Sequence, residues 1–162
     1  MDMENLEKAV VGLMQRLNKT LATAESCTGG LLAKRLTDIP GASAVFPGGV
    51  VAYSNPAKIK LLGLDPALIA EKGAVSHEVA LAMADGARDR FGADIGIGIT
   101  GIAGPDSDGS GIEPGTVHIA LATHGKSECR SFKLSADRDG VRFLAASNAL
   151  DMVHKYLAEL LV

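Results

Sequence analysis

Ser26 and Cys27 stand in a turn of small and polar residues, Glu25-Ser26-Cys27-Thr28-Gly29-Gly30, between a short apolar run and a helical pattern. Either residue is a candidate nucleophile, and N–H groups left free at a helix start can receive a phosphate or a developing oxyanion. The same spacing fits a plain helix cap in which the glycines only permit close packing, and spacing alone favours this cap. The phosphate-binding pattern GxxxxGK[ST] does not occur in the chain.

A second candidate segment, Tyr53-Ser54-Asn55-Pro56-Ala57-Lys58, follows another apolar run. A tyrosine at a strand end can stack on a flat ring, more strongly if that ring is cationic, although an ordinary rim aromatic fits as well. Lys58 can act as a general base if burial and its neighbours lower its pKa. A solvated helix lysine, of the kind that Lys60 illustrates, is the commoner outcome for such a residue.

Two later segments can bind a ligand. Thr100-Gly101-Ile102-Ala103-Gly104-Pro105 can present backbone N–H groups and a hydroxyl, although two glycines also fit a tight turn. Arg138 and Arg142 stand at i and i+4, so both can face one way from a helix and clamp a phosphate. The alternative is a solvated helix face, on which the arginines pair with Asp137 and Asp139.

Strand and helix patterns alternate between these segments. Strands are expected at 20–24, 48–53, 94–100, 116–123 and 127–134, and helices at 3–18, 31–36, 55–62, from Pro66 onward, at 76–91 and at 137–160. The run at 48–53 reads as a buried strand. Glycines on one face of 94–100 imply the close approach of another element. The polar residues 105–114 predict a mobile loop.

These patterns predict a fold class. Early strands that alternate with helices favour parallel pairing, and a late hairpin around His124-Gly125-Lys126 adds an antiparallel member. We therefore expect an α/β protein, a three-layer α/β/α sandwich on a mixed, mostly parallel sheet of about five strands, in one domain over residues 1–162. Ligands of such sheets collect outside the carboxyl ends of the strands, where the first three candidate segments lie.

Composition excludes several classes of function. The chain has 162 residues, 16 of them Lys or Arg and 19 Asp or Glu, and the net charge of −3 argues against a broad nucleic-acid or membrane-binding surface. The two cysteines cannot form a disulfide framework, and the four histidines lack a metal-ligand spacing such as HExxH, so no metal site is expected. Without a signal-peptide pattern or an apolar run of about 18 residues, the expected location is the cytoplasm.

Six motifs in a fixed order resemble those of one family. They are Glu25–Gly30, Tyr53-Ser54-Asn55 with Lys58, Gly73-Ala74-Val75-Ser76, Thr100–Pro105, Gly115-Thr116-Val117 and Asp137-Arg138. The chain thereby resembles the C-terminal domain family of the competence-damage-inducible protein CinA, also called the nicotinamide-nucleotide amidohydrolase family. The resemblance covers nearly the whole chain, and because the N-terminal domain of longer CinA proteins has no counterpart here, we expect a stand-alone form.

The resemblance implies a reaction, a mechanism and a site. The family hydrolyses the carboxamide of nicotinamide mononucleotide to nicotinic acid mononucleotide and ammonia, with a serine and a lysine in place of a Ser-His-Asp triad and without a cofactor. Catalytic roles would fall on Ser26, Lys58, Tyr53 and Thr100. Substrate contacts would fall on Cys27, Thr28, Gly29, Gly30, Asn55, Gly101, Arg138 and Arg142. Members commonly self-associate, so a homodimer is expected, and neither nucleic acid nor a membrane is an expected partner.

Two departures from the family pattern concern substrate affinity rather than chemistry. Relatives often carry Gly-Asp-Arg where this chain has Ala136-Asp137-Arg138, and Pro-Val where it has Glu113-Pro114. Two alternatives to the serine mechanism stay open from the sequence. One is a non-catalytic nucleotide-binding or competence-related regulatory domain, and the other is an amidohydrolase with Cys27 as its nucleophile.

Overall fold

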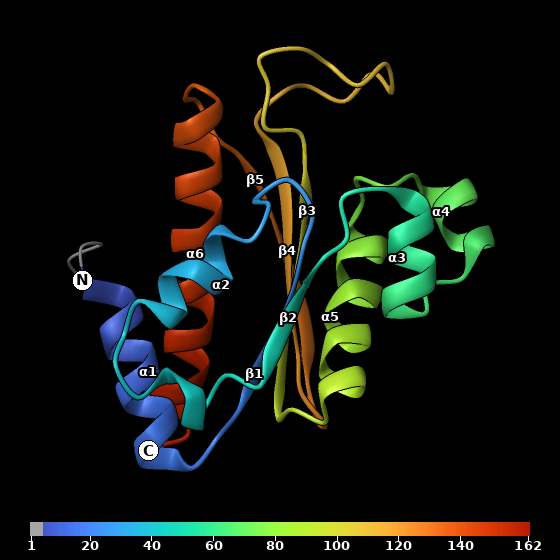
Figure 1. Ribbon diagram of the computed structural model, residues 1–162. Helices are drawn as coiled ribbons and strands as arrows, with labels where there is room; N and C mark the ends of the chain where they lie inside the picture. The colour runs from blue at the N-terminus through green and yellow to red at the C-terminus, as the bar shows by residue number, and fades with distance from the viewer. Residues whose placement is uncertain (1–4) are drawn as a thin grey trace.

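The computed structural model describes residues 5–162 (Figure 1). The first residues of the helix expected at 3–18, and of the domain expected at 1–162, lie outside this range. The strands are β1 (Leu21–Glu25), β2 (Gly48–Val51), β3 (Ile95–Gly101), β4 (Thr116–Ala122) and β5 (Ser127–Lys133). The helices are α1 (Leu6–Leu17), α2 (Leu31–Thr37), α3 (Asn55–Leu62), α4 (Pro66–Lys72), α5 (His77–Phe91) and α6 (Arg138–Glu159), with a short 3₁₀ turn at Ala42–Ala44.

The five strands form one sheet in the order β2-β1-β3-β4-β5. Strand β1 pairs in parallel with β2 and β3, whereas β4 is antiparallel to both β3 and β5. Four strands therefore run in one direction and β4 runs against them. This arrangement confirms the mixed, mostly parallel sheet that the order of helices and strands predicts.

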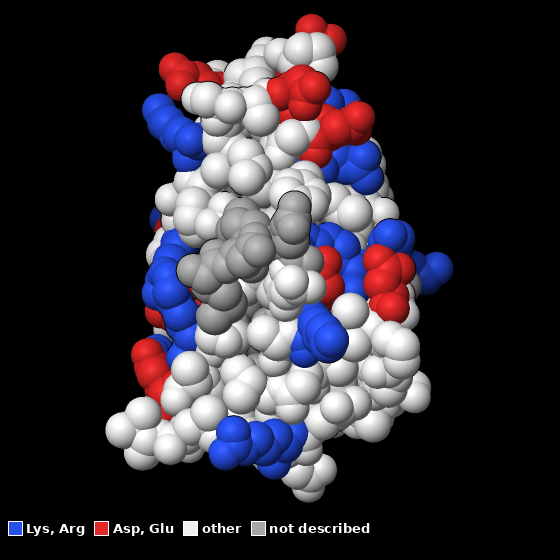
Figure 2. Space-filling view, turned by 90° about the vertical axis from the view of Figure 1, so that its left-hand side faces the viewer, with Lys and Arg blue, Asp and Glu red and all other residues white. Residues whose placement is uncertain are grey.

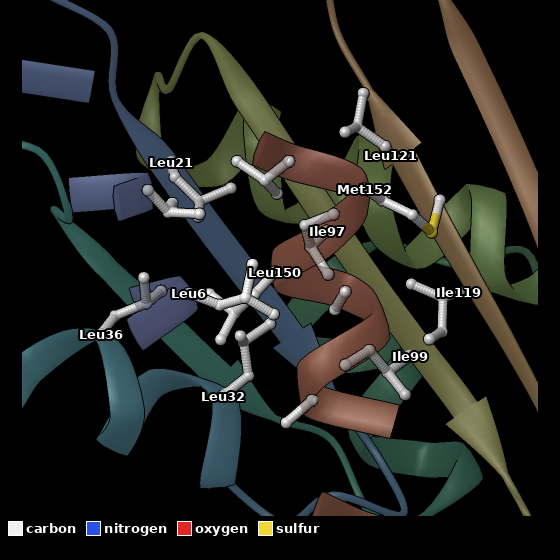
Figure 3. Packing of buried hydrophobic residues seen from close by; sticks show 14 of the residues in the cluster. Leu6, Leu21, Leu32, Leu36, Ile97, Ile99, Ile119, Leu121, Leu150 and Met152 are labelled. Carbon is white, nitrogen blue, oxygen red and sulfur yellow. The ribbon is translucent and has the colours of Figure 1, made fainter. Parts of the chain in front are cut away.

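Helices cover both faces of the sheet, which confirms the three-layer sandwich. Figure 1 shows α1, α2 and α6 on one face and α3, α4 and α5 on the other. Between the sheet and the first group, α6 packs Leu150 and Met152 against the aliphatic side chains of Ile97, Ile99 and Ile119 (Figure 3). Burial of these groups stabilises the fold by about 25 cal/mol for each Å² of apolar surface removed from water.

The glycine face of β3 lies directly under α5, as the sequence predicts. A Cβ at Gly98 would overlap the carbonyl oxygen of Ala80, and a Cβ at Gly96 would overlap that of Ala84. The absence of side chains on this face lets the α5 backbone approach the strand. This contact fixes the α5 layer against the strand that ends at the candidate site.

The strand expected at 48–53 differs from the prediction in length and in burial. Strand β2 ends at Val51, and its side chains alternate between half-buried and exposed, with Val51 49% exposed. The reason is position: β2 is at the edge of the sheet and has a neighbour on one side only. An apolar run of this length does not distinguish an edge strand from a buried one.

Surface charge is mixed on the face formed by α1, α2 and α6. Basic and acidic side chains lie interspersed there rather than in separate fields (Figure 2). None of the helices described between residues 5 and 162 is long and apolar enough to cross a membrane.

Candidate active site

A cavity of about 280 Å³ lies at the carboxyl ends of β1 and β3. Its lining includes eight of the residues predicted for the site: Ser26, Cys27, Tyr53, Asn55, Lys58, Thr100, Gly101 and Arg138. Four others, Thr28, Gly29, Gly30 and Arg142, are not among the lining residues. This volume lies near the lower end of the range found for small-molecule pockets.

Lys58 and Ser26 meet inside the protein. The Lys58 side chain is only 2% exposed, and its Nζ lies 3.1 Å from the Ser26 Oγ and donates to the Ala52 carbonyl oxygen at 3.0 Å. Burial disfavours the charged amine and lowers the pKa of Lys58 below its ordinary value of 10.5. The sequence alone favours a solvated lysine at this position, and the structure shows instead that Lys58 is buried. A neutral amine at this position can accept the hydroxyl proton of Ser26.

Local sequence explains how α3 delivers the lysine. Ser54 caps the helix by accepting a hydrogen bond from the Ala57 N–H at 3.2 Å, and Pro56 occupies the first turn, where its missing N–H is harmless. Lys58 then falls one turn into the helix, on its buried side. The cap and the proline thus direct the lysine toward the end of β1.

Ser26 is fixed by the strand that precedes it. Its N–H donates to the Ile99 carbonyl oxygen at 3.0 Å and so extends the pairing of β1 with β3 by one residue. The buried carboxylate of Glu25 accepts from the N–H groups of Leu32 at 2.8 Å and Ala33 at 3.1 Å. The N–H groups at the start of α2, which the sequence suggests as an anion site, therefore already have a partner.

The turn after Ser26 offers other donors. Gly29 and Gly30 have φ angles of 60° and 98°, left-handed values that glycine adopts without strain, and the Gly29 N–H donates to the Ser26 carbonyl oxygen at 3.0 Å. Within residues 5–162, no backbone carbonyl accepts a hydrogen bond from the N–H groups of Cys27 and Thr28. They are the candidate donors to an oxyanion formed next to Ser26.

Cys27 lines the cavity beside Ser26 but is poorly suited to attack. Burial raises the pKa of its thiol to about 11, so the thiol is protonated at neutral pH. The serine has an amine within hydrogen-bond distance, whereas among residues 5–162 no base is hydrogen-bonded to the thiol. The geometry thus favours Ser26 over Cys27 as nucleophile.

Thr100 joins the end of β3 to the segment before α5. Its Oγ1 donates to the Ala74 carbonyl oxygen at 2.7 Å, which draws Ala74 and Val75 into the cavity wall. Since the hydroxyl hydrogen is used in this bond, the oxygen has lone pairs left to accept from a ligand. The Gly73–Ser76 motif thereby contributes to the same cavity.

The two arginines of α6 do different things. Arg138 lines the cavity and donates to the Gly104 carbonyl oxygen at 2.7 Å and to the Tyr53 hydroxyl at 3.1 Å. Arg142 donates from Nη2 to the Thr28 carbonyl oxygen at 3.1 Å, outside the cavity lining. The i, i+4 spacing allows both arginines to bind one phosphate, but only Arg138 reaches the cavity.

The loop after β3 supplies residues that sequence reasoning did not place in the site. Asp106, Ser107 and Asp108 line the outer part of the cavity. The signal was weak: the two carboxylates come five and seven residues after the end of β3, in a polar segment with glycines that the sequence predicts to be a mobile loop. Among residues 5–162, no group of three or more His, Cys, Asp or Glu side chains is arranged to hold a metal ion.

Comparisons with known proteins agree with these motifs. A model of the CinA C-terminal domain matches residues 3–157. CinA-like proteins of Geotalea daltonii and Geobacter sulfurreducens are 47% and 48% identical over 156 and 152 residues. These matches cover 96% and 94% of this chain but only 38% and 37% of the relatives, so the chain spans less than half of their length.

Solved structures show the same fold. A competence-damaged protein (CinA) superfamily protein from Klebsiella pneumoniae superposes with a TM-score of 0.94 at 32% identity, covering 98% of this chain and 99% of that one. A competence/damage inducible protein from Agrobacterium tumefaciens gives 0.91 at 36% identity, covering 98% and 96%. The chain belongs to the CinA C-terminal domain family.

Proposed function

We propose that this member of the CinA C-terminal domain family hydrolyses the carboxamide of nicotinamide mononucleotide, giving nicotinic acid mononucleotide and ammonia. The observation that carries the proposal is the 3.1 Å contact between the buried Lys58 amine and the Ser26 hydroxyl at the floor of a cavity. A serine is a weak nucleophile until a base takes its proton, and a lysine with a lowered pKa is such a base. A nucleophile and a base in contact can together transfer the acyl group of an amide.

The proposed reaction has two stages, acylation of Ser26 and hydrolysis of the acyl ester. Neutral Lys58 takes the hydroxyl proton as the Ser26 Oγ bonds to the carboxamide carbon, and the carbonyl oxygen becomes an oxyanion. The free N–H groups of Cys27 and Thr28 would stabilise this charge, and one such donor typically contributes about 3–4 kcal/mol to the transition state. When the C–N bond breaks, Lys58 returns the proton to the nitrogen and ammonia leaves. Water, deprotonated by Lys58, then attacks the acyl ester, and Ser26 recovers its proton as the acid is released.

The rest of the cavity matches the rest of the nucleotide. The Arg138 guanidinium suits the 5′-phosphate, and the Tyr53 ring beside it suits stacking on the cationic pyridinium. Binding energy from the phosphate, remote from the reacting carbon, would orient the carboxamide against Ser26. The free lone pairs of Thr100 can accept a hydrogen bond from the amide NH₂ group.

Ammonia release from nicotinamide mononucleotide by the purified protein tests the proposal, with Ser26→Ala and Cys27→Ser measured alongside. Release by the wild type and by Cys27→Ser, but not by Ser26→Ala, is the expected result. An active Ser26→Ala protein would overturn the serine mechanism. If the folded wild type releases nothing yet is stabilised against heat by the nucleotide, the site is a non-catalytic nucleotide-binding module.

A further inference from the structure

Arg142 touches the turn that carries the nucleophile rather than the cavity. Its Nη2 donates to the Thr28 carbonyl oxygen at 3.1 Å, and a Cβ added at Gly29 would lie 3.0 Å from the same nitrogen. Within residues 5–162, no carboxylate forms a salt bridge with this guanidinium. A cation without an acidic partner is therefore held against a backbone carbonyl, directly after the candidate oxyanion donors.

This contact sets the orientation of one peptide plane. The Thr28 carbonyl oxygen also accepts from the Leu31 N–H at 3.0 Å, so it is held by two donors. In a trans peptide the C=O and N–H bonds point in opposite directions. With its carbonyl turned to Arg142, the Thr28–Gly29 peptide directs the Gly29 N–H the other way, where it donates to the Ser26 carbonyl oxygen at 3.0 Å.

The opposed directions of C=O and N–H also fix the next peptide plane, that of Ser26–Cys27. Because the Ser26 carbonyl is held by Gly29 inside the turn, the Cys27 N–H of the Ser26–Cys27 peptide points away from that bond. Cys27 lines the cavity, and no backbone carbonyl accepts from its N–H within residues 5–162. Arg142 is thus linked to a candidate oxyanion donor through two hydrogen bonds and two planar peptides.

We infer that Arg142 is a positioning residue for the oxyanion hole: it fixes the Thr28–Gly29 peptide and thereby aims the Cys27 N–H, without contacting the substrate. The inference rests on the proposed function, because an oxyanion forms there only if Ser26 attacks a carbonyl. The two arginines of α6 then have different roles. Arg138 lines the cavity, and Arg142 contacts the turn that follows Ser26.

Kinetics with two substrates separates this role from phosphate binding. Nicotinamide mononucleotide and nicotinamide riboside share the carboxamide and differ by the phosphate. Arg142→Gln should lower kcat about 10- to 100-fold on both, with KM nearly unchanged, because a misaimed donor weakens only the transition state. Arg142→Lys should recover part of the loss, since an ammonium can still donate to the Thr28 carbonyl. Arg138→Gln should instead raise KM for the mononucleotide alone.

Opposite patterns would overturn the inference. If Arg142→Gln raises KM for the mononucleotide and spares the riboside, Arg142 binds phosphate; if it changes neither constant, it does not position the site. Arg16→Gln, an exposed arginine at the end of α1, is the matched control and should behave as the wild type.

Hydrogen exchange gives a readout that does not depend on turnover. Amides of residues 27–31 should exchange faster in Arg142→Gln than in the wild type, with the melting temperature of the whole protein little changed. Unchanged exchange would overturn the inference even if the enzyme is active. If the wild type releases no ammonia from either substrate, the proposed function fails, and this measurement still decides whether Arg142 holds the turn.

Discussion

The carboxylate of Glu25, at the end of β1, accepts a hydrogen bond from the Leu32 N–H at 2.8 Å and so ties the strand to the helix that follows the nucleophile. Its second oxygen accepts from the Ala33 N–H at 3.1 Å. The turn that carries Ser26 lies between the end of β1 and the start of α2, which these two hydrogen bonds hold together. A side chain that does not line the cavity thereby decides where the turn begins and ends.

Replacing Glu25 should therefore destabilise the fold. Glu25→Ala leaves the buried N–H of Leu32 and the half-buried N–H of Ala33 without a partner and should lower the free energy of unfolding by about 2–4 kcal/mol. Glu25→Gln keeps one acceptor oxygen and should cost less. Urea denaturation measures both, with Glu113→Gln as the control, since Glu113 is exposed and its removal should change stability by less than about 0.5 kcal/mol. Equal stability of Glu25→Ala and the wild type would show that the cap is not needed.

The pH dependence of activity should report the lowered pKa of Lys58. Only the neutral amine can take the Ser26 proton, so kcat/KM should rise with pH and level off below pH 10.5, the ordinary lysine value. Measurements between pH 7 and 10 avoid the second phosphate ionisation near about 6. A kcat/KM that still rises about tenfold per pH unit up to pH 10 would mean that burial does not activate the lysine.

Lys58 should make the stability of the wild type rise with pH, and Lys58→Met should remove this dependence. The folded protein holds Lys58 at a pKa below its unfolded value, so between those values the unfolded chain binds more protons, and wild-type stability rises with pH. Lys58→Met removes this term. The variant should gain stability relative to the wild type at neutral pH, and the gain should vanish as pH approaches 10.5.

Activity gives the second readout for the same variant. Lys58→Met should lose at least about 100-fold in kcat, because no other base is hydrogen-bonded to Ser26 among residues 5–162. Thermal melts at several pH values, run beside the ammonia assay, measure both effects. A variant less stable than the wild type at pH 7 would contradict the burial argument.

The close contact between β3 and α5 should not tolerate a methyl group. Gly98→Ala would place a Cβ against the Ala80 carbonyl and 2.6 Å from the Ala84 N, so α5 must move and the free energy of unfolding should fall by about 1–3 kcal/mol. Gly125→Ala is the matched control, because a Cβ there meets nothing within 4 Å. Denaturation of the two variants compares them directly, and equal stabilities would show that the helix can shift freely.

Most helices and strands could be predicted from the sequence, because hydrophobic periodicity and capping residues are local patterns. Ser76 accepts from the Val79 N–H at the start of α5, and Asp137 accepts from the Gly140 N–H at the start of α6, as their sequence positions indicate. The burial of the 48–53 strand was predicted wrongly, because position within a sheet depends on which strands pair. That choice is made by residues far away in the sequence.

By itself, the sequence determined the order of helices and strands, the family motifs and the short list of residues that could do chemistry. These follow from local periodicity, capping and residue type. Only the tertiary structure decided that Lys58 is buried against Ser26, 32 residues earlier, and that Arg138 faces the cavity while Arg142 faces a backbone carbonyl. The reason is physical: the pKa of an amine and the partner of a guanidinium depend on the solvent and charge around them, which the packing of distant segments creates.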